Sequence, residues 1–157
     1  MSRILVACFS ASGVTAAKAK ELAAAANADY YEIQPAAPYT AADLKWTNPL
    51  ARCNREWIRK QKPALSDTDA AVADHDVIFL AFPIWYYTAP LITNGFLEKY
   101  DFAGKTVVCF ATSGGSDMKK VQKSLAPCVP GADLKIGWML NGGVDAAAVE
   151  ALVASLG

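Results

Sequence analysis

Three short segments hold most of the residues that could do chemistry in this sequence. The first, at residues 10–15, reads Ser-Ala-Ser-Gly-Val-Thr and comes directly before an alanine-rich stretch typical of a helix. Hydroxyls, a glycine and the free amides of a helix start can hold an anion without any basic side chain. The same residues also suit a plain helix cap, and neither a Walker motif nor G-x-G-x-x-G is present. The candidate phosphate contacts are Ser10, Ser12, Gly13, Val14 and Thr15.

The second segment, at residues 83–90, places three successive aromatic residues between two prolines. Such a loop is stiff and offers flat faces, so a planar heterocycle could stack against it. The aromatic side chains could equally close the end of the core. The candidate contacts to a ring are Pro83, Ile84, Trp85 and Tyr86.

The third segment, at residues 112–116, reads Thr-Ser-Gly-Gly-Ser. Two glycines allow backbone to approach a ligand closely, although the segment could also be a turn that caps the next helix. Its candidate ligand contacts are Thr112, Ser113, Gly114 and Gly115. Taken together, the three segments describe a ligand with a phosphate joined to a planar ring.

The elements that must position these segments alternate between strand and helix. Continuous apolar runs predict buried strands, and two weaker runs complete a set of five: Arg3–Phe9, Tyr30–Gln34, Val77–Phe82, Thr106–Ala111 and Leu134–Leu140. Helical patterns lie between and after them, at Val14–Ala26, Leu91–Tyr100, Asp117–Ala126 and Asp145–Leu156. This alternation predicts an α/β fold with a doubly wound, five-stranded parallel sheet. The three segments would then meet at the carboxyl ends of the strands.

Residues 35–69 are more than a simple crossover needs, so we expect a partly helical insertion there. Thr40 could cap a helix that begins at Ala41, and Pro49 should interrupt it. A second helical piece is expected over Leu50–Lys62. Its basic residues should form a solvated helix face rather than an anion site; they are Arg52, Arg55, Arg59, Lys60 and Lys62.

Over nearly its whole length the sequence resembles the flavodoxin-like family. Residues 9–15 are similar to the family's phosphate loop, and residues 82–86 and 110–116 to its two ring-binding loops. In the insertion, Trp46, Arg52 and Glu56 resemble the pattern of a short-chain branch. The resemblance implies one flavodoxin-like domain over residues 1–157, the strand order 2-1-3-4-5 and FMN as cofactor.

The resemblance also implies a role in electron transfer. In flavodoxins, a loop peptide turns over when the flavin takes up one electron, and this turn is easiest at glycine. Residues 84–87 contain no glycine, so the turn should be costly and electrons should be accepted mainly in pairs. We therefore expect a small oxidoreductase that reduces quinone-like acceptors, with NAD(P)H as a candidate donor. The alternatives are a one-electron carrier, or an interaction module of the same fold without FMN.

Composition narrows the remaining possibilities. The chain has 157 residues and a net charge of zero, which argues against a nucleic-acid binder. Residues 77–98 are nearly uncharged but contain prolines and a glycine, and the first residues lack a signal-peptide core, so a cytoplasmic protein without a membrane span is expected. The four cysteines show no zinc spacing and should be reduced thiols. The single histidine, His75, is expected at the surface or at a strand entry rather than as a catalytic base.

Overall fold

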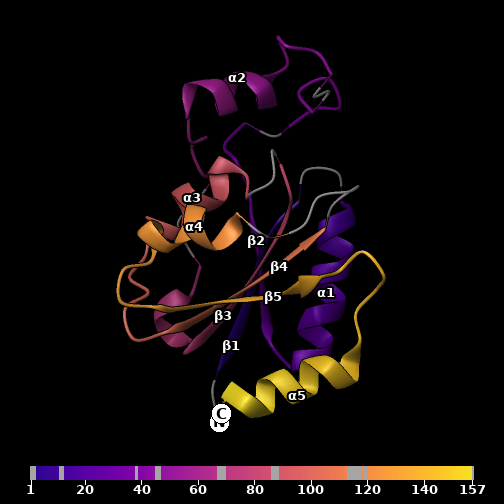
Figure 1. Cartoon of the computed structure of the whole chain (residues 1–157), viewed down its shortest axis with the longest axis vertical. Coiled ribbons are helices and arrows are strands. Elements are labelled where there is room, and N and C mark those ends of the chain that lie inside the picture. The colour runs from indigo at the N-terminus through magenta and orange to yellow at the C-terminus, as the bar shows by residue number, and fades with distance from the viewer. Residues whose placement is uncertain are drawn as a thin grey trace.

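Five parallel strands form one twisted sheet at the centre of the protein (Figure 1). Along the sheet the order is β2-β1-β3-β4-β5, which confirms the predicted topology. The strands are β1 (Ile4–Phe9), β2 (Asp29–Ile33), β3 (Val77–Pro83), β4 (Thr106–Thr112) and β5 (Asp133–Met139). The structure is a computed structural model that describes residues 3–10, 13–37, 39–44, 47–66, 70–85, 89–112, 118 and 120–156.

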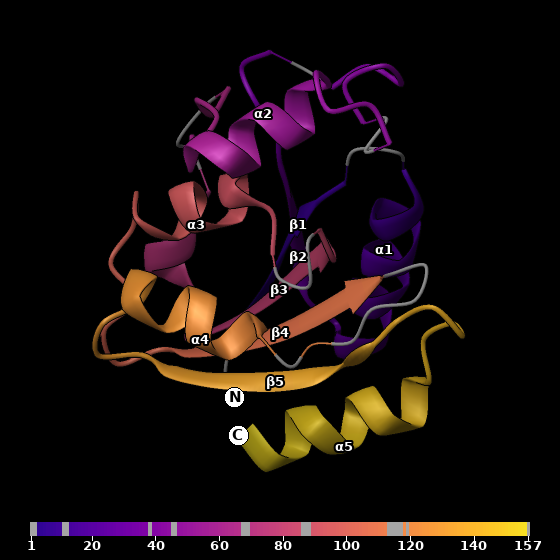
Figure 2. The ribbon, with the colours of Figure 1, turned by 45° about the horizontal axis from the view of Figure 1, so that its top comes forward.

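Helices cover both faces of the sheet, as its apolar strands require. Figure 2 shows α3 (Leu91–Leu97) and α4 (Val121–Leu125) on one side, and α1 (Val14–Ala26) and α5 (Ala146–Leu156) on the other. The two faces have separate cores, because alternate residues of each strand point to opposite sides. All six residues of β1 are buried. The helices predicted at Val14–Ala26 and Asp145–Leu156 are both present, and their bounds are within one residue of those predicted.

Three predicted helices differ from the structure. The helix expected from Ala41 is wrong, since residues 41–44 form only a turn. In that turn the Asp43 amide donates to the Thr40 hydroxyl and the Thr40 amide donates to the Asp43 carboxylate, at 3.2 and 3.0 Å. These two hydrogen bonds pair the polar groups of the turn with each other, so no helix has to follow. Helix α4 begins at Val121, four residues later than predicted, and α3 ends at Leu97 instead of Tyr100.

The insertion contributes one helix in its described part, α2 (Arg52–Arg59), which lies beyond the carboxyl ends of the strands (Figures 1 and 2). Its two ends are tied together by an antiparallel bridge between Pro35 and Leu65. Helix α2 ends at Lys60, whose backbone is left-handed with φ 52°. The insertion thus leaves the sheet and returns to it at the same edge.

His75 joins two strands at the opposite, amino-terminal edge of the sheet. Its side chain is 3% exposed, with Nδ1 2.6 Å from the Ala71 carbonyl and Nε2 2.7 Å from the Asp29 carboxylate. It does lie at a strand entry, but it is not at the surface, because both ring nitrogens are hydrogen-bonded and Nε2 fastens the start of β3 to Asp29 at the start of β2. The His75 hydrogen bond, with help from Arg3, holds the pKa of Asp29 below its ordinary value.

The four cysteines are free thiols, three of them buried. Burial raises the pKa of the Cys8 and Cys109 thiols to about 12. Among the described residues, no group of three or more His, Cys, Asp or Glu side chains could hold a metal ion. No helix in the described ranges is long and apolar enough to cross a membrane.

The Asp29–His75 contact predicts a specific acid sensitivity. A carboxyl whose folded pKa is lowered stabilises the fold above its unfolded pKa of about 3.9, and this contribution is lost as pH falls through the folded value. Asp29→Asn should therefore lower the free energy of unfolding at pH 7 and reduce its decline below about pH 4. Denaturant unfolding across this pH range measures both effects.

Asp74→Asn is the control, because Asp74 is an exposed carboxylate one residue away from His75. It should leave the pH dependence unchanged. An acid decline in Asp29→Asn as steep as in the parent would contradict the assignment.

Candidate functional site

The ends of β1, β3 and β4, from which the three segments start, lie next to one another at the carboxyl edge of the sheet (Figure 1). Their strands are neighbours, with Cys8 paired to Ala81 and Pro83 paired to Thr112. The Ile84 amide continues the ladder past the end of β3 by donating to the Thr112 carbonyl at 2.8 Å. The predicted convergence of the three segments is therefore present for the residues that the structure describes.

The first loop is shaped to receive an anion. Gly13 has a left-handed backbone, with φ 92°, and its amide donates to the Ser10 hydroxyl at 3.0 Å. The first helical bond runs from the Ala17 amide to the Gly13 carbonyl, so the amides of Val14, Thr15 and Ala16 have no acceptor within the helix. The first turn of α1 carries no acidic residue. The amides and the positive end of the helix dipole together favour a phosphate.

A buried pair of hydroxyls links this loop to the third one. Thr15 is 2% exposed, and its Oγ1 lies 2.7 Å from Oγ1 of Thr112 at the end of β4. The side chain of Thr15 therefore points into the junction between α1 and β4. Its backbone amide is still at the helix start.

The loop after β3 is held by aromatic packing. Trp85 meets Phe9 edge-on at 5.7 Å between ring centroids and Tyr39 edge-on at 5.5 Å. Phe9 and Tyr39 also contact each other at 5.9 Å. These three rings form an aromatic cluster at the end of β1, where a flat ligand could be packed.

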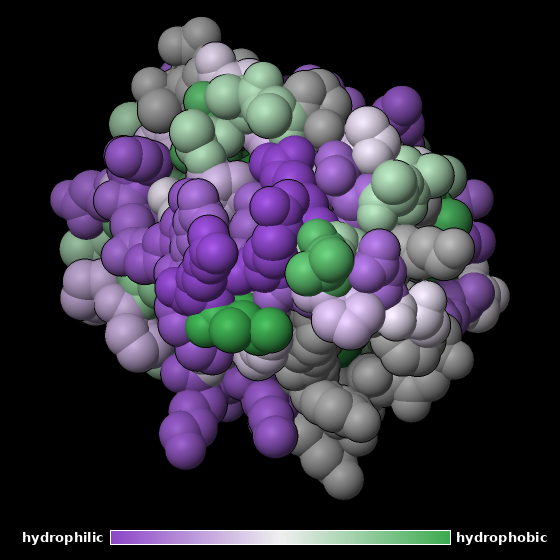
Figure 3. Space-filling model, turned by 90° about the horizontal axis from the view of Figure 1, so that it is seen from above, coloured by the Kyte–Doolittle hydropathy of each residue, from purple (hydrophilic) through white to green (hydrophobic). Residues whose placement is uncertain are grey.

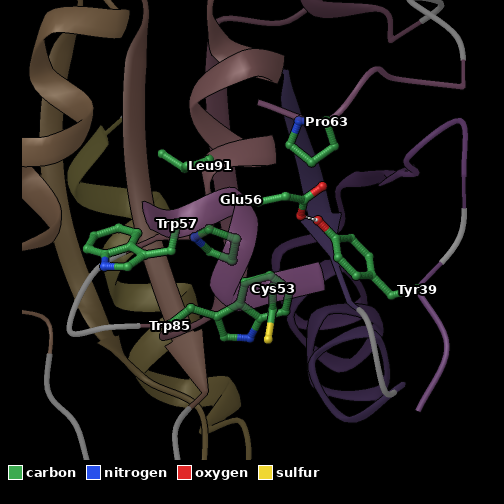
Figure 4. Close-up of a pocket in the computed structure, with 8 residues that line it drawn as sticks. Tyr39, Cys53, Glu56, Trp57, Pro63, Trp85 and Leu91 are labelled. Carbon is green, nitrogen blue, oxygen red and sulfur yellow. Dashed lines mark hydrogen bonds between the residues drawn. The ribbon is translucent and has the colours of Figure 1, made fainter. Parts of the chain in front are cut away.

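Tyr39 comes from the insertion and was not predicted as part of the site. Its hydroxyl donates to Oε1 of Glu56 at 2.5 Å (Figure 4). Arg52 Nε donates to Oε2 of the same carboxylate at 3.0 Å. The guanidinium of Arg52 also lies 4.0 Å from the centroid of the Tyr39 ring. Burial, reinforced by the hydrogen bond to Glu56, raises the pKa of Tyr39, so this hydroxyl remains a donor.

This contact corrects one prediction about the basic residues. The side chain of Arg52 is 17% exposed, whereas a solvated position was expected. It is drawn inward because it balances Glu56, which is 9% exposed, and donates to the Ala37 carbonyl at 2.6 Å. Arg55 and Arg59 are exposed, as predicted. The four-residue spacing of Arg52 and Glu56 on a helix, together with their resemblance to the short-chain branch, is the sequence signal for this pair.

A small pocket separates α2 from the loop after β3 (Figure 4). Its volume of about 10 Å³ has room for about one water molecule, so a ring would bind at its rim rather than inside. The residues that line it are Tyr39, Cys53, Glu56, Trp57, Pro63, Trp85, Pro90 and Leu91.

Several predicted site residues lie outside the described part of the chain and stay predictions: Ser12, Tyr86, Ser113, Gly114, Gly115 and Trp46. The structure does bring the others to one edge of the sheet. These are Ser10, Gly13, Val14, Thr15, Pro83, Ile84, Trp85 and Thr112.

A doubly wound sheet of this order, with an anion-binding helix start after its first strand, defines the flavodoxin-like class of folds. The family model described as Flavodoxin matches residues 3–156. The chain therefore belongs to the flavodoxin family, and its cofactor is FMN. A comparison with curated proteins gave no match.

Solved structures share this fold. A candidate flavoprotein from Bacteroides eggerthii DSM 20697 is 42% identical, covers 99% of this chain and 98% of its own, and has a TM-score of 0.91. A flavoprotein from Lactobacillus acidophilus NCFM in complex with FMN is 16% identical, with a TM-score of 0.68 over 88% of this chain and 93% of its own. An NADH:FMN oxidoreductase in its apo form is 17% identical, with a TM-score of 0.58 over 98% and 90%.

The residues present fit FMN. The phosphate would be held by the Ser10 hydroxyl and the amides of Val14 and Thr15, and a Cβ built on Gly13 would meet no atom within 4 Å, so the cradle is open. The aromatic cluster offers a surface for the ring at the ends of β1 and β3. That no basic side chain contacts the phosphate stays a prediction.

The Thr15–Thr112 pair predicts an energetic coupling between the first and third loops. Thr15→Val should lower the free energy of unfolding by about 1 to 3 kcal/mol, because it leaves the Thr112 hydroxyl buried without its partner. Adding Thr112→Val to it should cost less than the sum of the two single changes. Urea unfolding of the four proteins measures this coupling.

Thr93→Val is a matched control, since Thr93 is fully buried in α3 and its hydroxyl has no partner among the described residues. It should not lower stability. Strict additivity of Thr15→Val and Thr112→Val would show that the hydroxyls are not coupled.

Proposed function

We propose that this protein is an FMN-dependent oxidoreductase that takes electrons in pairs from NAD(P)H and passes them to quinone-like acceptors. The observation that carries this proposal is the fixed start of the loop after β3. The Ile84 amide is bonded to the Thr112 carbonyl, and Trp85 is packed between Phe9 and Tyr39. Residues 84–87 contain no glycine. A backbone turn at Ile84 or Trp85 would break these contacts, and a turn at any of residues 84–87 would force a residue with a side chain to positive φ.

A loop in which this turn is costly gives little extra stability to a flavin that has gained a single electron. The two one-electron potentials should then lie close together or cross, which favours transfer in pairs. FMN, when bound, supplies this redox chemistry, and the protein binds it, orients it and limits its solvent contact. Pairwise transfer suits hydride donors and quinones.

The residues of the insertion support the same reading. Tyr39 holds Trp85 from one side, and Glu56 and Arg52 hold Tyr39. The net charge of zero gives little long-range attraction toward a charged protein partner, which a one-electron carrier would need. The FMN complex of the Lactobacillus flavoprotein and the NADH:FMN oxidoreductase, both of this fold, are in keeping with the proposal.

FMN binding should depend on Trp85. Trp85→Ala should weaken FMN binding by at least about 0.5 to 1.5 kcal/mol, because the aromatic surface next to the ring is lost. Trp85→Phe should retain most of the affinity, which makes it the matched control. Quenching of FMN fluorescence on titration with the protein measures both dissociation constants.

Equal affinity of Trp85→Ala and the parent would exclude stacking on this residue. Absence of FMN binding by the parent would favour an interaction module of the same fold without cofactor.

Reduction should proceed in a single two-electron stage. An anaerobic reductive titration of the FMN-loaded protein should convert oxidised to fully reduced flavin through one set of isosbestic points. Rapid mixing with NADPH should reduce the flavin directly. A third species with long-wavelength absorbance, dominant at half reduction, would contradict pairwise transfer and favour a one-electron carrier.

A further inference from the structure

Three arginines of helix α2 line one hollow. Arg52, Arg55 and Arg59 are spaced by three and four residues and therefore share a face of the helix. Together with Glu56 and Gln61 they line a hollow of about 300 Å³. Figure 3 views this end of the molecule, where hydrophilic side chains gather beside a few hydrophobic ones.

Carboxylates balance only part of the positive charge in this hollow: Arg52 pairs with Glu56 and with Asp43, and Asp43 also lies within electrostatic reach of Arg55. Glu56 is the carboxylate that lines it, and Glu56 already accepts hydrogen bonds from Tyr39 and Arg52. Among the described residues, Arg55 and Arg59 are exposed and have no ion-pair partner. They lie four residues apart on one helix, where like charges repel each other. A bound anion would remove this repulsion.

The hollow lies beside the candidate flavin site. It shares Glu56 with the small pocket that Trp85 lines, so one ligand could reach from the arginines toward the loop after β3. It is separate from the first loop, whose anion contacts come from residues 10–15 without any basic side chain. The chain thus has a second place for negative charge at the same end of the sheet.

We propose that Arg55 and Arg59 bind a phosphate group of the small molecule that exchanges electrons with the flavin. Guanidinium groups present paired donors that match phosphate oxygens, and a hollow suits a small ligand better than a flat protein surface. The phosphate could belong to a dinucleotide donor or to a phosphorylated acceptor. The role in electron exchange rests on the proposed function, whereas anion binding itself does not.

The test uses inorganic pyrophosphate as the probe, titrated calorimetrically into the FMN-saturated protein at constant ionic strength. The double variant Arg55→Gln/Arg59→Gln should bind pyrophosphate about tenfold or more weakly than the parent, because two charge-assisted contacts are lost. Lys99→Gln/Lys123→Gln is the control, since it removes the same charge from exposed positions outside α2. It should stay within about twofold of the parent.

Adenosine 2′,5′-bisphosphate distinguishes the two sources of the phosphate. Arginine-dependent binding that is tighter than that of pyrophosphate indicates a dinucleotide, and equal binding indicates a simpler phosphorylated compound. No binding by the parent at about 10 mM pyrophosphate, or equal weakening in both double variants, overturns the proposal.

The same titration without FMN keeps this result apart from the proposed function. If the protein fails to bind FMN or to react with NADPH, the difference between the arginine variant and the parent still reports on the anion site. Loss of that difference in both conditions rejects the site even if the oxidoreductase activity is present.

Discussion

The central strands are apolar on both sides, and this constraint decides where function can lie. A sheet whose strands β1, β3 and β4 are buried along nearly their whole length must be covered by helices on both faces. Neither face is then open to a ligand, and only the strand ends remain. The amino-terminal edge carries the contact of His75 with Asp29 and, beside it, an open hollow of about 770 Å³. The carboxyl edge keeps the free amides of α1 and the polar ends of the loops, so the candidate site lies there.

The insertion adds a polar anchor to this otherwise apolar arrangement. A buried carboxylate is costly unless its oxygens are paired, and both oxygens of Glu56 are used, by Tyr39 and by Arg52. Because Tyr39 also packs on Phe9 and Trp85, this polar contact fixes an aromatic wall at the end of β1. The same contact fixes the orientation of α2. It therefore also fixes the side of the molecule on which Arg55 and Arg59 lie.

The parts that were predictable from the sequence are those whose signal is local. The strands β1, β3 and β4 are unbroken apolar runs, and the hydroxyl-rich start of α1 can be recognised without tertiary information. The sequence predicts a helix at Thr40 although only a turn forms, because a capping pair has the same residue pattern whether or not a helix follows. No sequence pattern marks Tyr39 as a site residue, because its partners are set by how the insertion folds back onto the sheet. The burial of the Arg52 side chain is not predictable from the sequence, because it depends on the contacts with Tyr39 and Glu56 that form only in the folded insertion.

The buried thiols have a consequence for the lifetime of the protein. Reduced flavins pass electrons to dioxygen and release hydrogen peroxide, which attacks thiolates far faster than thiols. Cys8 and Cys109 lie in the central strands, protonated and out of solvent. These two core thiols are thereby kept from the oxidant that a reduced flavin can generate.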